Sequence, residues 1–68
     1  MKIFKLYKHP KMLDSAMIPT KIEEKGNDII ARVIWVNVTN LKNMFPMGND
    51  TVKIRKDDLN QWKEITHD

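Results

Sequence analysis

Cysteine is absent from this chain, and glycine and arginine are scarce, with two of each among 68 residues. The lack of cysteine excludes disulfides and thiolate ligands for zinc. Two glycines are too few for a glycine-rich loop that cradles phosphate. An apolar core must therefore stabilise the fold, and residues 1–68 are short enough that we assign them to a single domain.

Long apolar runs are also missing. None approaches the ~20 residues that span a bilayer, and three lysines interrupt the first eight residues, unlike the apolar region of a secretory signal. We therefore expect a cytoplasmic protein with no membrane partner.

Residues suited to catalysis are few. His9 stands beside a proline and His67 lies next to the C-terminus, and neither belongs to a Ser/His/Asp or Cys/His arrangement. The adjacent Asp57 and Asp58 would point apart, and helix capping explains them better than a catalytic pair. No His, Asp or Glu set has metal-ligand spacing. We expect no enzymatic activity, no metal and no cofactor.

The most informative run is Ile29–Val38, which is dense in β-branched and aromatic residues and contains one charge, Arg32. This composition indicates a long strand about which the domain is arranged. Alternation places Trp35 and Arg32 on opposite faces of that strand. Because both faces are mostly apolar, we expect the strand to be covered on both sides or curled into a barrel.

Three further strands are predicted at Lys2–Lys8, Ala16–Glu24 and Thr51–Arg55. Pro19 within the second indicates a bulge or an edge position. The tetrapeptide Lys25-Gly26-Asn27-Asp28 has the residues of a tight hairpin turn.

The remaining segments are predicted to be irregular, apart from a C-terminal helical turn. Lys11–Ser15 is expected to be a loop or a single turn of helix, and a loop is expected at Asn40–Asp50, where Pro46 and Gly48 interrupt the apolar pattern. The helical turn should follow Asp57 or Asp58 as its cap, and residues 66–68 should form a loose end. Its apolar positions are Leu59, Trp62 and Ile65.

These elements predict a mainly β domain of four to five strands with a short C-terminal helical turn. The architecture resembles a small SH3-like or Tudor-like barrel, or a strongly bent antiparallel sheet. In its small size, its abundant lysine and asparagine and its lack of cysteine, the chain is similar to small accessory proteins encoded by bacteriophages. That resemblance implies a protein that modulates a host protein by occupying its surface.

Positive charge is concentrated near the N-terminus. The net charge is +3, yet residues 12–68 hold eight basic and nine acidic groups, so the excess comes from Lys2, Lys5, Lys8 and Lys11. Lysines interleaved with aromatic residues can bind single-stranded nucleic acid, and Tyr7 and Arg32 would extend such a patch. The alternative is a solvated edge strand whose lysines prevent edge-to-edge pairing.

An apolar surface is predicted in the long loop, at Met44, Phe45, Pro46 and Met47. Flexible thioethers beside an aromatic ring form adaptable contacts in protein interfaces. Alternatively, Phe45 and one methionine fold back to plug an open end of the barrel.

The leading hypothesis is a non-enzymatic protein-binding module that uses this loop as its anchor, with the N-terminal lysines steering it toward an acidic partner. The second hypothesis is nucleic-acid binding through the N-terminal lysines, Tyr7 and Arg32. The third is self-assembly into a homo-oligomer through exposed edge strands.

Overall fold

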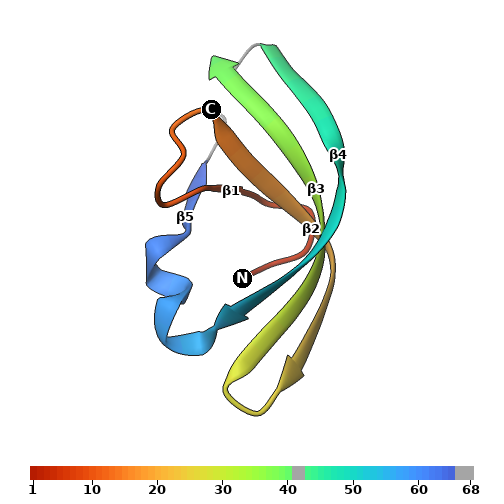
Figure 1. The fold of residues 1–68 in the computed structure, drawn as a ribbon, viewed down its shortest axis with the longest axis vertical. Coiled ribbons are helices and arrows are strands. Elements are labelled where there is room, and N and C mark those ends of the chain that lie inside the picture. Colours follow the sequence, from red (N-terminus) through yellow and green to blue (C-terminus); the bar gives the residue numbers. More distant parts are fainter. Residues whose placement is uncertain (41–42, 66–68) are drawn as a thin grey trace.

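The computed structural model describes residues 1–40 and 43–65, although the side chains of residues 39, 40, 43 and 44 lie outside this description. Five antiparallel strands form one sheet in the order β4-β3-β2-β1-β5 (Figure 1). The elements are β1 Leu6–Lys8, β2 Ser15–Lys25, β3 Asp28–Asn40, β4 Asn43–Arg55, the 3₁₀ helix η1 Lys56–Gln61 and β5 Lys63–Ile65. The predicted mainly β class with a short C-terminal helical turn is confirmed.

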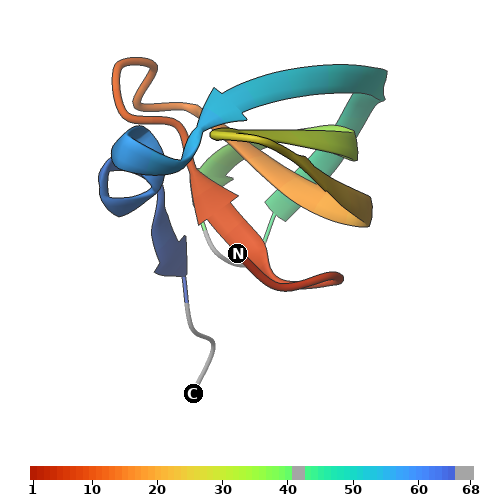
Figure 2. The same ribbon diagram turned by 90° about the horizontal axis from the view of Figure 1, so that it is seen from below.

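The three long strands β2, β3 and β4 form a meander that curves around β1 and η1 (Figures 1 and 2). The predicted strand at Ile29–Val38 is confirmed as the inner part of β3, which pairs with β2 on one side and β4 on the other. The predicted turn joins β2 to β3, and Gly26 adopts φ +60°, a conformation that favours glycine.

The pairing register places each side chain on one of the two faces of the sheet, because directly opposed residues of neighbouring strands point to the same side. We call the side of Ala31, Val33 and Trp35 the tryptophan face. The side of Arg32, Ile34 and Val36 is the arginine face. Trp35 and Arg32 therefore lie on opposite faces, as alternation predicted.

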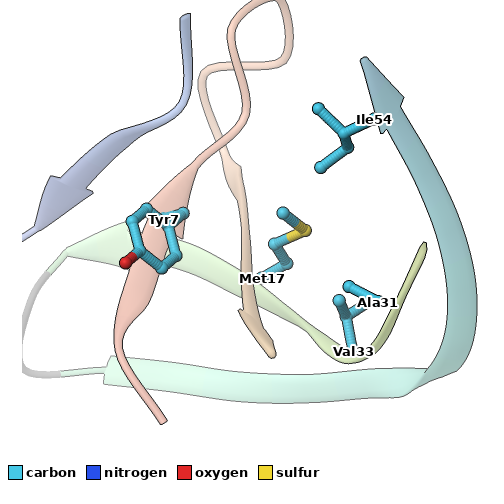
Figure 3. Packing of buried hydrophobic residues seen from close by; sticks show 5 residues of the cluster. All are labelled: Tyr7, Met17, Ala31, Val33 and Ile54. Atoms are coloured by element: carbon cyan, nitrogen blue, oxygen red, sulfur yellow. The ribbon is translucent and has the colours of Figure 1, made fainter. Parts of the chain in front are cut away.

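Each face carries its own apolar cluster. The larger cluster, on the tryptophan face, contains side chains from β1 to β4 that point toward one another (Figure 3). Its buried members are Tyr7, Met17, Ala31, Val33 and Ile54. Leu59 and Trp62, two of the predicted apolar positions of the helical turn, pack against it, as does Val52.

The second cluster lies on the arginine face and contains Leu6, Ala16 and Val36. Ile65 packs against it from β5, opposite Leu6. Its predicted place on the helical turn with Leu59 and Trp62 is therefore wrong: the turn ends at Gln61 and the chain continues as a strand. The expectation that both faces of β3 are covered is confirmed where these two clusters lie.

The predicted loop at Asn40–Asp50 is wrong over most of its length, because β4 begins at Asn43 and runs through Pro46 and Gly48. The strand tolerates Pro46 because β4 is an edge strand, which leaves room for a residue that lacks an N–H. Pro46 pairs with Val36 and Gly48 with Trp35, so Met47 is an extra residue in a bulge. Gly48 adopts φ +147°, a region that L side chains rarely enter.

Two smaller predictions also need correction. The first strand covers only Leu6–Lys8, since a turn at Ile3 and Phe4, with φ +65° at Phe4, precedes it. The position before η1 is occupied by Arg55, with no side-chain cap hydrogen bond, so Asp57 and Asp58 lie in the first turn and do not cap it.

The prediction for Pro19 is resolved in favour of a bulge between Pro19 and Lys21, because β2 lies inside the sheet. The predicted loose end at 66–68 lies outside the described residues. Within the part of the chain that the structure describes, no helix has the length and apolar character needed to cross a membrane.

The fully buried Met17 gives a direct test of the core. Met17→Ala should lower the free energy of unfolding by about 2–5 kcal/mol, because it removes apolar burial and leaves a cavity. Met12→Ala is the matched control: this methionine is 53% exposed, and its replacement should change stability by less than about 0.5 kcal/mol. Urea unfolding of both variants checks the assignment, and equal losses would contradict it.

Candidate functional site

Three aromatic rings from distant parts of the chain meet on the tryptophan face. The ring centroid of His9 lies 5.1 Å from that of Trp62, in a T-shaped arrangement, and 6.0 Å from that of Trp35. The two tryptophan centroids are 6.2 Å apart. These contacts attach the segment after β1 and the segment after η1 to β3.

His9 also organises the loop that follows it. Its Nδ1 atom accepts hydrogen bonds from the backbone N–H groups of Lys11 and Met12, each at 3.0 Å. Because Nδ1 acts as an acceptor, the proton of the neutral ring lies on Nε2. His9 therefore positions Met12 relative to the tryptophans.

A groove of about 370 Å³ lies beside this aromatic group. The groove is lined by Trp35 from β3 and by Met12 from the loop before β2. The neighbouring strand β4 contributes Met47, Gly48 and Asp50. The Trp35 indole Nε1 donates to Asp50 Oδ2 at 3.4 Å, and the backbone N–H of Thr51 donates to Asp50 Oδ1 at 2.8 Å. Asp50 thus orients the indole that lines the groove.

Large apolar side chains are exposed around this groove. Met12 and Met47 are each 53% exposed, and Phe45 is 60% exposed. Phe45 pairs with Asn37, so it lies on the tryptophan face, two residues before Met47. Leu13 is exposed beside Met12 in the loop. Isolated exposed apolar residues are ordinary, but several around one groove are typical of a binding site.

The predicted apolar surface at residues 44–47 is therefore placed on a strand and not in a loop. The structure brings Met47 into the groove and leaves Phe45 exposed nearby, so the alternative in which Phe45 plugs the domain is not observed. Pro46 points to the arginine face, because it pairs with Val36. The backbone of Met44 belongs to β4, but its side chain lies outside the described part.

The residues predicted to bind nucleic acid are not brought together. Tyr7 is only 6% exposed, and its hydroxyl accepts a hydrogen bond from the Lys2 N–H at 2.7 Å, so its ring cannot stack on a base. Lys2, Lys5, Lys8 and Lys11 are exposed, but only Lys8 belongs to a strand. Arg32 is exposed on the face opposite Trp35.

Sequence reasoning missed the part of the site that comes from the loop. Met12, Leu13 and the contacts of His9 depend on how residues 9–14 return over the sheet, and no periodicity marks that path. The adjacent apolar pair Met12-Leu13 in an otherwise polar segment is the one signal that could have indicated them. Among the described residues, no group of three or more His, Cys, Asp or Glu side chains could hold a metal ion.

The role of His9 can be tested by His9→Ala. The substitution removes the acceptor for two backbone N–H groups and the contact with Trp62, and it should destabilise the protein by about 1–2 kcal/mol. Amide hydrogen exchange at Lys11 and Met12 should become faster. Lys11→Ala, an exposed change in the same loop, serves as the control. Unchanged exchange in His9→Ala would show that the imidazole does not hold the loop.

Comparison of the chain with protein-family models, with curated proteins and with solved structures finds no match.

Proposed function

We propose that this protein is a non-enzymatic binding module that recognises another protein through the groove on the tryptophan face. The observation that supports the proposal is the gathering of Met12, Phe45 and Met47, all more than half exposed, around a groove lined by Trp35. A small domain has few apolar side chains, so leaving these outside the core is costly unless a partner covers them.

The chemistry of the groove favours an apolar anchor from the partner. Two unbranched thioether side chains can adapt to the shape of an inserted residue, and an indole ring supplies a broad, rigid contact. Such a residue, desolvated between Met12 and Met47 against Trp35, would contribute most of the binding energy, as central anchors do in other interfaces.

The charge on the tryptophan face changes the partner charge that was expected from the sequence. The strand residues of the tryptophan face include the carboxylates Asp50 and Glu64, which stand opposite Val33 and Tyr7. Glu24 lies on the same face in the row of Ile29, where it forms an ion pair with Lys56 Nζ at 3.4 Å. The described strands place no lysine or arginine on this face. A basic rim on the partner therefore complements this surface better than the acidic partner expected from the N-terminal lysines.

A phage-type accessory factor with an SH3-like domain, acting in the cytoplasm on a host protein, would fit such a module. In that role the protein would work by occupying the host protein's surface, since binding alone is enough to block another contact.

The proposal predicts the behaviour of Phe45→Ala combined with Met47→Ala. Capture of a protein from a bacterial cytosolic lysate, in the presence of nuclease, should fall to background in the double variant. The melting temperature should change little, because both side chains are more than half exposed. Mass spectrometry of the retained protein, followed by titration calorimetry with that protein, measures the loss of affinity.

Ile3→Ala combined with Phe4→Ala is the matched control, since these apolar residues are also exposed but belong to the turn before β1 and not to β4. The control should retain the partner. Equal loss in both double variants, or a large fall in melting temperature for the Phe45 and Met47 pair, would contradict the proposal. A mass that rises with protein concentration in light scattering would instead support the self-assembly hypothesis.

A further inference from the structure

The strands sort their basic residues onto one face. All seven lysines and arginines in the five described strands lie on the arginine face, according to the register that pairs each with a neighbour. They are Lys8, Lys21, Lys25, Arg32, Lys53, Arg55 and Lys63, and all are exposed. The carboxylates on this face are Glu23 and Asp28, so its strand residues carry a net charge of +5.

Five of these basic residues form a compact array on β2, β3 and β4. Three successive rows across the strands read Lys21-Arg32-Thr51, then Glu23-Ile30-Lys53, then Lys25-Asp28-Arg55. Neighbouring strands are about 4.8 Å apart and successive rows about 6.6 Å apart, so the Cα atoms of the five basic residues lie within a patch about 10 by 13 Å across. We call this patch the basic array.

The ion pairs within the basic array leave most of its charge available. Lys21 Nζ lies 3.3 Å from Glu23 Oε1, and Lys53 Nζ lies 3.4 Å from Asp28 Oδ2. Both lysine side chains are still more than 60% exposed, and exposed pairs of this kind contribute little to stability. An incoming anion can therefore compete for them.

Two pairs of like charges on this face are not explained by folding. Lys21 stands directly opposite Arg32, and Lys8 stands directly opposite Lys63. Like charges directly opposed across two strands destabilise a sheet. Glu23 offsets part of this repulsion at Lys21, and an anionic ligand that bridges such a pair would offset the rest, so the arrangement favours anion binding.

Polar side chains that suit phosphate surround Arg32. A shallow hollow of the sheet is lined by Thr20, Arg32, Asn49 and Thr51, together with Val33, Ile34 and Asp50. Hydroxyl and amide groups beside an arginine are common phosphate contacts in nucleic-acid-binding proteins. The Thr20 hydroxyl donates to the Arg32 carbonyl oxygen at 3.3 Å, so Asn49 and Thr51 are the candidate phosphate donors. The strand register directs the carboxylate of Asp50 to the tryptophan face, where it accepts from Trp35 Nε1 and the Thr51 N–H.

We propose that the arginine face binds the phosphate backbone of double-stranded nucleic acid through the basic array, with Arg32 in the row beside the polar hollow. A duplex is favoured over a single strand because the aromatic residues of the described strands, Tyr7, Trp35 and Phe45, all lie on the other face. Single-strand binding depends on aromatic stacking, whereas duplex binding through phosphates needs only charge and hydrogen-bond donors.

The test measures affinity for a short fluorescein-labelled DNA duplex by fluorescence anisotropy, at salt concentrations between about 50 and 200 mM. The wild-type protein should show an affinity that falls steeply with salt. Arg32→Gln combined with Lys53→Gln should weaken binding about tenfold or more at low salt. It should also reduce the slope of log affinity against log salt by about 2, since each phosphate contact contributes about 0.9.

The matched control is Lys2→Gln combined with Lys5→Gln, which removes the same charge from the N-terminal segment outside the strands. It should retain nearly the wild-type affinity and slope. Arg32→Gln removes the charge repulsion with Lys21, so the melting temperature of the Arg32 and Lys53 double variant should not fall. An unchanged melting temperature shows that this variant is folded.

Three results would overturn the proposal. The first is a wild-type protein that shows no salt-dependent binding to the duplex. The others are a control variant that loses as much affinity as the Arg32 and Lys53 variant, and polyglutamate that binds as tightly as the duplex. Phe45→Ala combined with Met47→Ala, which alters the opposite face, should leave duplex binding unchanged. Failure of this proposal is therefore distinguishable from failure of the groove proposal.

Discussion

The pairing register of β3 is the constraint on which the rest of the molecule depends. Because side chains alternate with a period of two, a slip of one residue would move Ala31 and Val33 from the core to solvent and carry Arg32 inward. Pairing on both sides of β3 transmits this choice to β2 and β4. The same register that buries the core therefore decides where every charged residue of the meander lies.

The parts of the fold that could be predicted are those encoded by local pattern. The run at Ile29–Val38 combines β-branched residues with a turn at Gly26, and both signals act over a few neighbouring residues. The segment that became β4 carries the opposite local signal, because Pro46 and Gly48 ordinarily interrupt strands. Its place at the edge of the sheet, together with the bulge at Met47, makes these residues acceptable, and neither property is visible locally.

Only those residues of the candidate site that lie on β4 could be predicted from the sequence. Phe45 and Met47 stand out as apolar residues beside a proline, whereas Met12 and His9 join them through contacts between distant parts of the chain. Tyr7 was predicted to be exposed because lysines lie on both sides of it in the sequence. Alternation along β1 instead points its ring into the larger cluster, while Lys8 is exposed to water. A residue's neighbours in sequence therefore predict its exposure poorly in a strand this short.

The pairing of β5 with β1 has a consequence for how the protein opens. The meander is built from consecutive strands, so its pairs close over short loops, whereas β1 and β5 bring together opposite ends of the chain. Closing that large loop costs conformational entropy, which is offset by three residue pairs, the packing of Ile65 on the second cluster and the contact of His9 with Trp62. Local opening begins at elements with few buried contacts. The edge strand β5 has no buried residue, whereas β1 contributes Leu6 and Tyr7 to the core, so we expect β5 to separate first and proteolysis of the native protein to begin there.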